Sequence, residues 1–233
     1  MESPGRRGLP PPAPPAERTA GQLVGEALRL YGRRFWRALA LGLGPAAVAV
    51  GVNLLASPAN LIFAATGGAV VLTLCYIGAC LLAGPTNRTR RSLATALVVG
   101  TLVFVPVPFL TRILVLPAVA WLALFGLAVP VALYEERGLR ESLRRAVTLA
   151  RADFVHALGS LATLAIVGFV SALALSALLI QFGDQARSTA ALLPLLLVSP
   201  VLLLGAAQLY FDQAARAAPV RKGLTSPQPR GGK

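Results

Sequence analysis

Few side chains of this 233-residue chain have the type and spacing that chemistry requires, and the clearest candidates are an aspartate and the single histidine. Asp153 and His156 are three residues apart, so both lie on one face of any helix that contains them. A carboxylate beside an imidazole can hold or move a proton. The interpretation that we favour is structural: Asp153 caps the following helix, and His156 lies at a membrane boundary, where polar groups cost little.

The other candidates also lack the spacing of a catalytic or metal site. Cys75 and Cys80 lie five residues apart in one apolar segment, so on a helix they point in different directions. We expect both to pack as small core residues, with neither a disulfide nor a bound metal. The expected role of Asp212 is an ion pair with an arginine of a helix that leads into a membrane span. The sequence therefore predicts no catalytic residue, no cofactor and no enzymatic activity.

The elements that would position these side chains are long apolar segments. The chain is 56% hydrophobic with a mean hydropathy of +0.70, which is more apolar surface than a soluble domain of this length can bury. A spanning helix needs roughly 20 mostly apolar residues, and these segments lack the alternation of barrel strands. The sequence predicts an all-α integral membrane protein with six transmembrane helices, over residues 35–56, 58–84, 93–111, 113–134, 154–180 and 189–211.

The apolar stretch from Leu93 to Tyr134 is about twice as long as one span needs to be. Arg112 interrupts it near its middle, and Pro106, Pro108 and Pro117 surround that position. We therefore expect the chain to fold back at Arg112, with two spans forming a tight hairpin.

The basic residues predict the orientation in the membrane. All but two of the 22 Lys and Arg residues lie in the termini or in alternate connectors, and the exceptions are Arg112 and Arg187. By the positive-inside rule, this pattern predicts a protein of the plasma membrane with both termini in the cytoplasm. The preponderance of Arg over Lys is typical of a bacterium with a GC-rich genome. A net charge of +13 also suits nucleic acid, but no basic globular module is present, so we expect no nucleic-acid partner.

Three parts follow from this organisation. Residues 1–18 are rich in proline and are expected to form a disordered cytoplasmic tail. Residues 19–217 are expected to form the six-helix membrane domain. Residues 218–233 are expected to be a second disordered, basic tail in the cytoplasm.

Two connectors have the pattern of amphipathic helices that lie at the membrane surface and lead into a span. Residues 20–34 place apolar and basic side chains on different faces. Residues 135–153 do the same. For this segment the spacing predicts an apolar stripe along one face and two ion pairs between neighbouring turns. The stripe is Leu139, Leu143, Val147 and Ala150, and the pairs are Glu136–Arg140 and Glu141–Arg145.

Anionic phospholipids are the partners that these two helices predict, because lipid phosphates turn a repulsive row of arginines into a favourable one. Other membrane proteins are a second class of partner. The arginines expected to contact anionic lipid are Arg29, Arg33, Arg37, Arg140, Arg144 and Arg145.

A weak internal repeat accompanies these helices. Residues 26–29 and 141–144 both precede an aromatic or apolar entry into a hairpin, and residues 92–97 resemble a degraded third copy. Three units, each a lead-in helix plus a hairpin, would account for six spans. The alternative is that any interfacial helix before a span has this appearance.

Three segments carry a resemblance to a known family. They are Val24-Gly25-Glu26-Ala27-Leu28-Arg29-Leu30-Tyr31 with Phe35-Trp36; Pro130-Val131-Ala132-Leu133-Tyr134-Glu135 with Leu143-Arg144-Arg145-Ala146 and Asp153-Phe154; and Leu209-Tyr210-Phe211-Asp212 with Arg216. Over residues 20–217 the chain resembles the membrane domain of some bacterial glycerophosphoryl diester phosphodiesterases and of stand-alone membrane proteins of unassigned function. In those enzymes a separate soluble barrel hydrolyses the substrate with paired histidines and a metal-binding acidic cluster. Because His156 is the only histidine here, the resemblance implies a membrane scaffold without hydrolysis.

Two hypotheses for the function follow. The first is a non-enzymatic scaffold or accessory protein for envelope or lipid processes. The second is a small transporter or permease that works through spans broken by proline, at Pro45, Pro117, Pro194 and Pro200. The absence of an acidic or basic residue in the middle of any predicted span favours the first.

Overall fold

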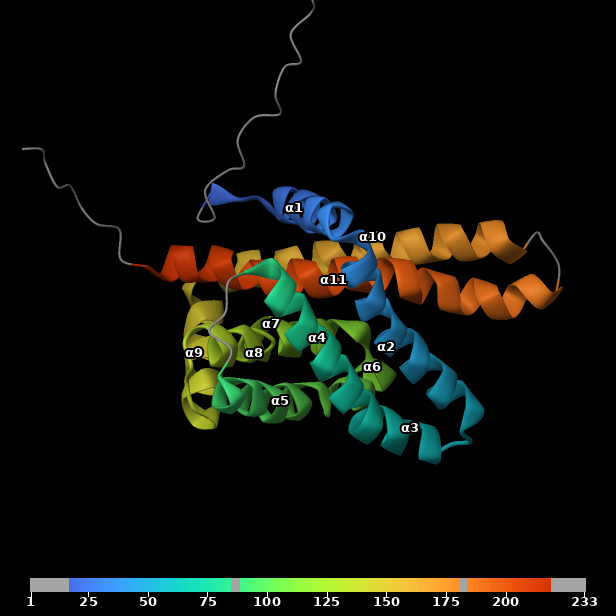
Figure 1. The fold of residues 1–233 in the computed structure, drawn as a ribbon, viewed down its shortest axis with the longest axis horizontal. Coiled ribbons are helices and arrows are strands. Elements are labelled where there is room, and N and C mark those ends of the chain that lie inside the picture. The colour runs from blue at the N-terminus through green and yellow to red at the C-terminus, as the bar shows by residue number, and fades with distance from the viewer. Residues whose placement is uncertain (1–16, 85–88, 181–183, 219–233) are drawn as a thin grey trace, which may run out of the picture.

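The computed structural model describes residues 17–84, 89–180 and 184–218, and for residues 179–180 and 184–191 it describes the backbone alone. Every regular element in these residues is helical (Figure 1), which confirms the predicted all-α fold. Most of the two predicted tails, residues 1–16 and 219–233, lies outside the described residues. The elements are α1 (Ala20–Arg33), α2 (Phe35–Leu54), α3 (Ala59–Phe63), the π-helical η2 (Ala64–Gly68), α4 (Ala69–Ala83), α5 (Arg90–Phe104), α6 (Val107–Ile113), α7 (Val115–Phe125), α8 (Ala128–Tyr134), α9 (Leu139–Ala152), α10 (Phe154–Ile180) and α11 (Asp184–Ala217).

Six helical segments in the described residues are long and apolar enough to cross a membrane, as predicted. In α2 and α10 only 11% of the most apolar stretch is buried inside the protein. Large apolar side chains therefore face outward, such as Phe169 of α10, which is 69% exposed. A monomer in water rarely exposes apolar surface on this scale, whereas lipid covers it at no cost. The fold is that of a multi-pass membrane protein.

The predicted spans begin and end within a few residues of the observed ones, except for the last. α11 has 34 residues, which at 1.5 Å per residue is about 51 Å, whereas the apolar core of a bilayer is about 30 Å thick. Its last turns, from Asp212 onward, continue past the predicted end at residue 211. They remain helical because their polar side chains have partners on other elements.

The spans pack as three hairpins. α2 packs against α4, α5 packs against α8, and α10 packs against α11. The predicted reversal near Arg112 is confirmed, because α6 ends at Ile113, α7 begins at Val115, and the two helices pack against each other.

Amphipathic helices precede the first and third hairpins, as predicted, and each packs mainly on a different hairpin from the one that it leads into. α1 begins with a capping box between Thr19 and Gln22, and it lies against α10 and α11. α9 lies across α7 and α8 and also contacts α11. Before the second hairpin the described residues form no separate helix, because residues 92–97 lie inside α5. The two lead-in helices therefore join the three hairpins into one bundle.

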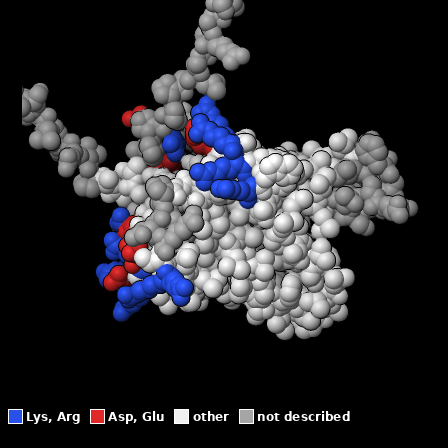
Figure 2. All heavy atoms as spheres, viewed as in Figure 1, with Lys and Arg blue, Asp and Glu red and all other residues white. Residues whose placement is uncertain are grey.

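Charged side chains gather at one end of the bundle, which we call the basic end (Figure 2). This end carries α1, α9 and the last turns of α11 (Figure 1). Among the basic residues whose side chains are described, Arg112 alone lies at the opposite end, in the last turn of α6. The predicted separation of charge therefore holds in space for the described residues.

Candidate functional site

The junction of α1 and α2 places three arginines together. Arg33 is the last residue of α1, Arg34 lies between the helices, and Arg37 is in the first turn of α2. All three side chains are exposed, and none has an acidic partner among the described residues. We call them the junction arginines. The sequence predicted two of the three, and Arg34 was missed because it lies off the four-residue spacing that drew attention to its neighbours.

Aromatic rings accompany the junction arginines. Trp36 is 79% exposed, and its ring meets that of Phe35 edge-on at a centroid distance of 5.3 Å. On the other side Phe35 meets the ring of Tyr31 at 5.4 Å. Burial raises the pKa of the Tyr31 phenol, so that residue stays neutral beside the arginines. Exposed aromatic rings next to basic side chains are typical of the layer where lipid headgroups meet hydrocarbon.

Burial of one face fixes α1 in place. Leu23, Val24 and Ala27 are buried against α10 and α11, which leaves the arginines on the outer side of the helix. Arg29, another residue expected to contact lipid, forms an ion pair with Glu26 at 3.0 Å, so part of its charge is already balanced. The structure thus separates Arg29 from the unpaired junction arginines.

α9 carries the other three predicted arginines. Arg140 and Arg144 are exposed, but Arg145 turns back and its Nε donates to Glu135 Oε1 at 3.4 Å. A groove between α9 and the end of α11 is lined by Arg144, Arg145 and Arg151. This groove is a second basic surface at the same end of the bundle as the junction arginines.

The two ion pairs predicted within this connector are wrong. Glu136 lies before the start of α9, with φ at 51°, so it has no helical spacing to Arg140. Arg145 pairs with Glu135 in place of Glu141. Glu135 is only 18% exposed and also accepts hydrogen bonds from Arg137 Nε at 2.6 Å and Tyr210 Oη at 3.1 Å. A half-buried carboxylate with several donors is a stronger partner than the exposed Glu141.

The predicted apolar stripe of α9 is only partly correct. Ala150 is buried as expected, but Leu139 is 42% exposed. Small residues make up most of the buried face, which consists of Ser142, Ala146, Leu149 and Ala150. Small side chains let α9 approach the helices below it closely, and Ser142 Oγ donates to the carbonyl of Arg137.

Replacing Glu135 with Ala is expected to loosen α9. The change leaves Arg145, Arg137 and the Tyr210 hydroxyl without their shared acceptor, which costs about 1–3 kcal/mol. Hydrogen exchange of the α9 amides should become faster in Glu135→Ala and stay unchanged in Glu141→Ala, the matched control. Equal exchange rates in the two variants would contradict the proposed anchoring.

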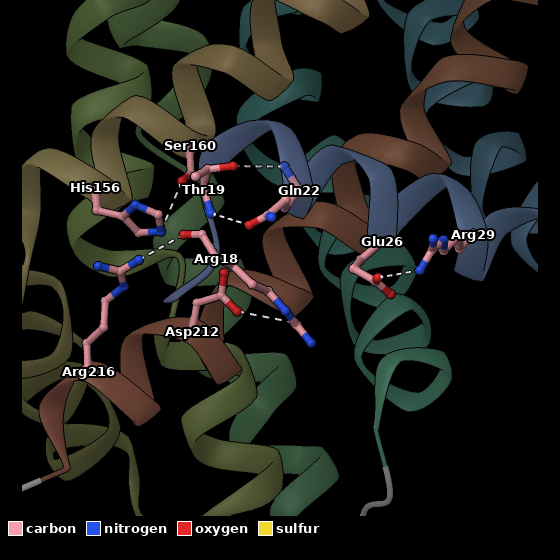
Figure 3. Close-up of polar contacts among 9 residues, drawn as sticks. All are labelled: Arg18, Thr19, Gln22, Glu26, Arg29, His156, Ser160, Asp212 and Arg216. Atoms are coloured by element: carbon pink, nitrogen blue, oxygen red, sulfur yellow. Dashed lines mark hydrogen bonds and ion pairs between the residues drawn. The ribbon is translucent and has the colours of Figure 1, made fainter. Parts of the chain in front are cut away.

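A second group of polar side chains lies where α10 begins and α11 ends, and Figure 3 shows Arg18, Asp212 and Arg216 of this group. We call Arg18, Asp153, Asp212 and Arg216 the terminal polar cluster. Arg18 Nη1 lies 3.3 Å from Asp212 Oδ1, and Arg216 Nη1 lies 2.9 Å from Asp153 Oδ2. Arg216 Nη2 also donates to the carbonyl of Arg18 at 2.9 Å. The cluster therefore connects the start of α1, the start of α10 and the end of α11.

The structural roles predicted for Asp153 and His156 fit this geometry. Asp153 Oδ1 accepts a hydrogen bond from the backbone N–H of His156 at 3.1 Å, as a helix cap does. The imidazole Nε2 lies 3.4 Å from Ser160 Oγ, on the next turn of α10. The carboxylate of Asp153 thus binds the backbone N–H of His156 and the side chain of Arg216. The imidazole of His156 contacts Ser160 and not this carboxylate.

Asp212 forms an ion pair with an arginine, as expected, but that arginine does not belong to a lead-in helix. Its partner, Arg18, lies two residues before α1. Nothing in the sequence singled out Arg18, because 194 positions separate the two residues. Arg216 belonged to a motif of the family resemblance, which was the only signal for it.

One space between the spans is lined almost entirely by apolar side chains. A cavity of about 180 Å³ lies between α4, α7, α10 and α11, lined by side chains such as Leu122, Leu164 and Leu203 and by the ring of Tyr76. α2 and α11 continue as helices through Pro45, Pro194 and Pro200. Tyr76 is the only polar side chain among the residues that line this cavity, so it offers few of the polar groups that a transport site needs.

Neither a search for metal ligands nor the comparison with known proteins assigns a further site to this chain. Within the described residues no three His, Cys, Asp or Glu side chains lie close enough together to hold a metal ion. Cys75 is half-buried, Cys80 is buried, and both are free thiols in the apolar interior. Comparison with protein-family models, curated proteins and solved structures finds no match to this chain.

Proposed function

We propose that this chain is a non-enzymatic multi-pass protein of the bacterial plasma membrane, a scaffold or accessory protein for envelope or lipid processes. It would hold anionic phospholipids at its basic end, which would face the cytoplasm together with both termini. The resemblance that three sequence segments suggest to the phosphodiesterase membrane domain, over residues 20–217, would imply the same kind of role.

The observation that carries this proposal is the exposed group formed by Arg33, Arg34 and Arg37 beside Trp36. Each Lys or Arg close to an anionic membrane surface contributes about 1 kcal/mol of attraction. The arginine-lined groove on α9 supports it as well. A small transporter has less support, because the cavity between the spans is lined by apolar side chains.

Replacing Arg33, Arg34 and Arg37 together with Gln is expected to weaken retention of phosphatidylglycerol by more than tenfold, since about 3 kcal/mol of surface attraction is lost. Native mass spectrometry of the full-length protein in detergent, with phosphatidylglycerol added in steps, measures the loss. The matched control replaces Glu26 and Arg29, which form an ion pair, with Gln. Because that change leaves the net charge unaltered, retention should stay within about twofold. Unchanged retention in the triple variant would refute the proposal.

A further inference from the structure

The end of the bundle opposite the junction arginines contains a hollow between the first and second hairpins. It has a volume of about 390 Å³, within the range of about 300–1,000 Å³ that is typical of small-molecule sites. One wall comes from α3, η2 and α4, and the other comes from α6. Figure 1 shows α3 and α6 at the same end of the bundle, away from α9. The hollow therefore lies at the boundary of the spans, where a lipid headgroup would lie.

The polar side chains of this hollow supply hydrogen-bond donors and one positive charge. Arg112, in the last turn of α6, is exposed and lines the hollow. Asn60, at the start of α3, lines it too, and no described residue is a hydrogen-bond partner of its side-chain amide. Thr111 has its hydroxyl directed to the carbonyls of Val107 and Pro108. The free donors are therefore those of Arg112 and Asn60, a combination suited to an anionic oxygen ligand.

The remaining lining is apolar. Leu61 and Leu72 face the hollow from the first hairpin, and Val107 faces it from the second. A soluble anion would leave this apolar surface uncovered, whereas a phospholipid presents a charged phosphate and a hydrocarbon chain together. None of the described residues that line the hollow is acidic, so its charge complements that of a phosphate.

We propose that this hollow binds one anionic phospholipid in the leaflet opposite the junction arginines. The guanidinium of Arg112 pairs with the lipid phosphate, the amide of Asn60 hydrogen-bonds to headgroup oxygens, and the acyl chain lies along Leu61, Leu72 and Val107. The lipid thereby joins the outer parts of the first two hairpins. This site concerns the other end of the bundle, so it stands or falls separately from the lipid contact at the junction.

The test is native mass spectrometry of the full-length protein in detergent, with phosphatidylglycerol added in steps and one strongly bound lipid followed. Arg112→Gln is expected to weaken the binding of that lipid by about tenfold, which is the effect of losing a charged hydrogen bond. Arg91→Gln, the same change at an exposed arginine in the first turn of α5, is the matched control and should leave the affinity for that lipid within about twofold. A lipid that binds Arg112→Gln as tightly as the wild type would overturn the proposal.

Two further measurements separate the lipid from other sources of phosphate and use the wild-type protein. Glycerol 3-phosphate is expected to displace the bound lipid only at far higher concentration, because it lacks the acyl chain. Equal competition by glycerol 3-phosphate would mean a site for free phosphate and would overturn the lipid assignment. A photoreactive phosphatidylglycerol should label peptides that contain Leu61 and Val107. Labelling confined to α1 and α9 would also overturn it, and this readout does not depend on any variant folding.

Discussion

Arg18→Met is expected to lower the free energy of unfolding by about 1–3 kcal/mol, the cost of leaving a buried polar group without its hydrogen-bond partner. The carboxylate of Asp212 is fully buried, and Arg18, which is 13% exposed, lies 3.3 Å from it. Removal of the guanidinium leaves Arg216 as the nearest cation of the terminal polar cluster, and that residue already pairs with Asp153. The measurement is denaturant unfolding of the full-length protein in detergent, followed by circular dichroism.

The control for this prediction is Glu17→Gln, which changes an exposed charge on the adjacent residue and should alter stability by less than about 0.5 kcal/mol. A second test is the double variant Arg18→Met with Asp212→Leu. Replacing both members of a buried pair with apolar residues is often neutral, so the double variant should be more stable than the single one. A single variant as stable as the wild type would show that the pair does not hold α1 in place.

The terminal polar cluster is not fully paired, and this limits what it contributes. Asp212 Oδ2 and Arg216 Nε of the cluster, and Oε1 of the neighbouring Gln213, are buried without a hydrogen-bond partner among the described residues. Each such atom offsets part of the gain from the bonds that are made. We therefore infer that the main effect of the cluster is to fix the position of α1, and that its net contribution to stability is small. With Arg18 replaced, amides of residues 20–33 should exchange faster than those of α9.

The spans were predictable because their cause is local in the sequence. A segment such as 154–180 is long and apolar enough to cross a bilayer whatever its neighbours are, and α10 begins and ends at those residues. The same holds for the reversal near Arg112, since a charge and prolines in the middle of an apolar stretch are visible without a structure. The amphipathic helix at 20–34 was predictable from its periodicity.

The contacts between elements were not predictable, because they depend on how the hairpins pack. Glu141 has ideal spacing to Arg145, yet the arginine binds Glu135, which Tyr210 from α11 helps to position. α9 buries Ser142 and Ala146 while it exposes Leu139, so close approach of helices outweighs the hydrophobicity of single side chains. The junction arginines lie between these cases. The exposure of Arg33 and Arg37 could be expected from the sequence, whereas the place of Arg34 beside them and the lack of acidic partners among the described residues required the structure.

Gly42→Ala is expected to destabilise the bundle by about 1–3 kcal/mol, the cost of overpacking. Gly42 is buried where α2 crosses α11, and a Cβ atom there would lie 2.1 Å from the carbonyl oxygen of Leu196. A backbone atom of a long helix cannot turn aside as a side chain can, so the two helices must move apart. Glycine at this position lets two membrane helices approach closely.

Gly159→Ala is the matched control, because it makes the same change in a spanning helix. No atom lies within 4 Å of a Cβ placed at Gly159 of α10, so this variant should be as stable as the wild type or slightly more so. Unfolding of both variants in detergent, under one set of conditions, measures the difference. Equal stability of the two variants would contradict the close crossing of α2 and α11.

The same pair of variants connects packing to the proposed lipid contact. Arg37 lies five residues before Gly42 on α2, so a shift of α2 away from α11 also displaces the junction arginines. Retention of phosphatidylglycerol is therefore expected to fall in Gly42→Ala and to persist in Gly159→Ala, although neither change removes a charge. If retention is equal in both variants while stability differs, the arginines bind lipid independently of where α2 lies. In that case the close packing of α2 serves the stability of the fold alone.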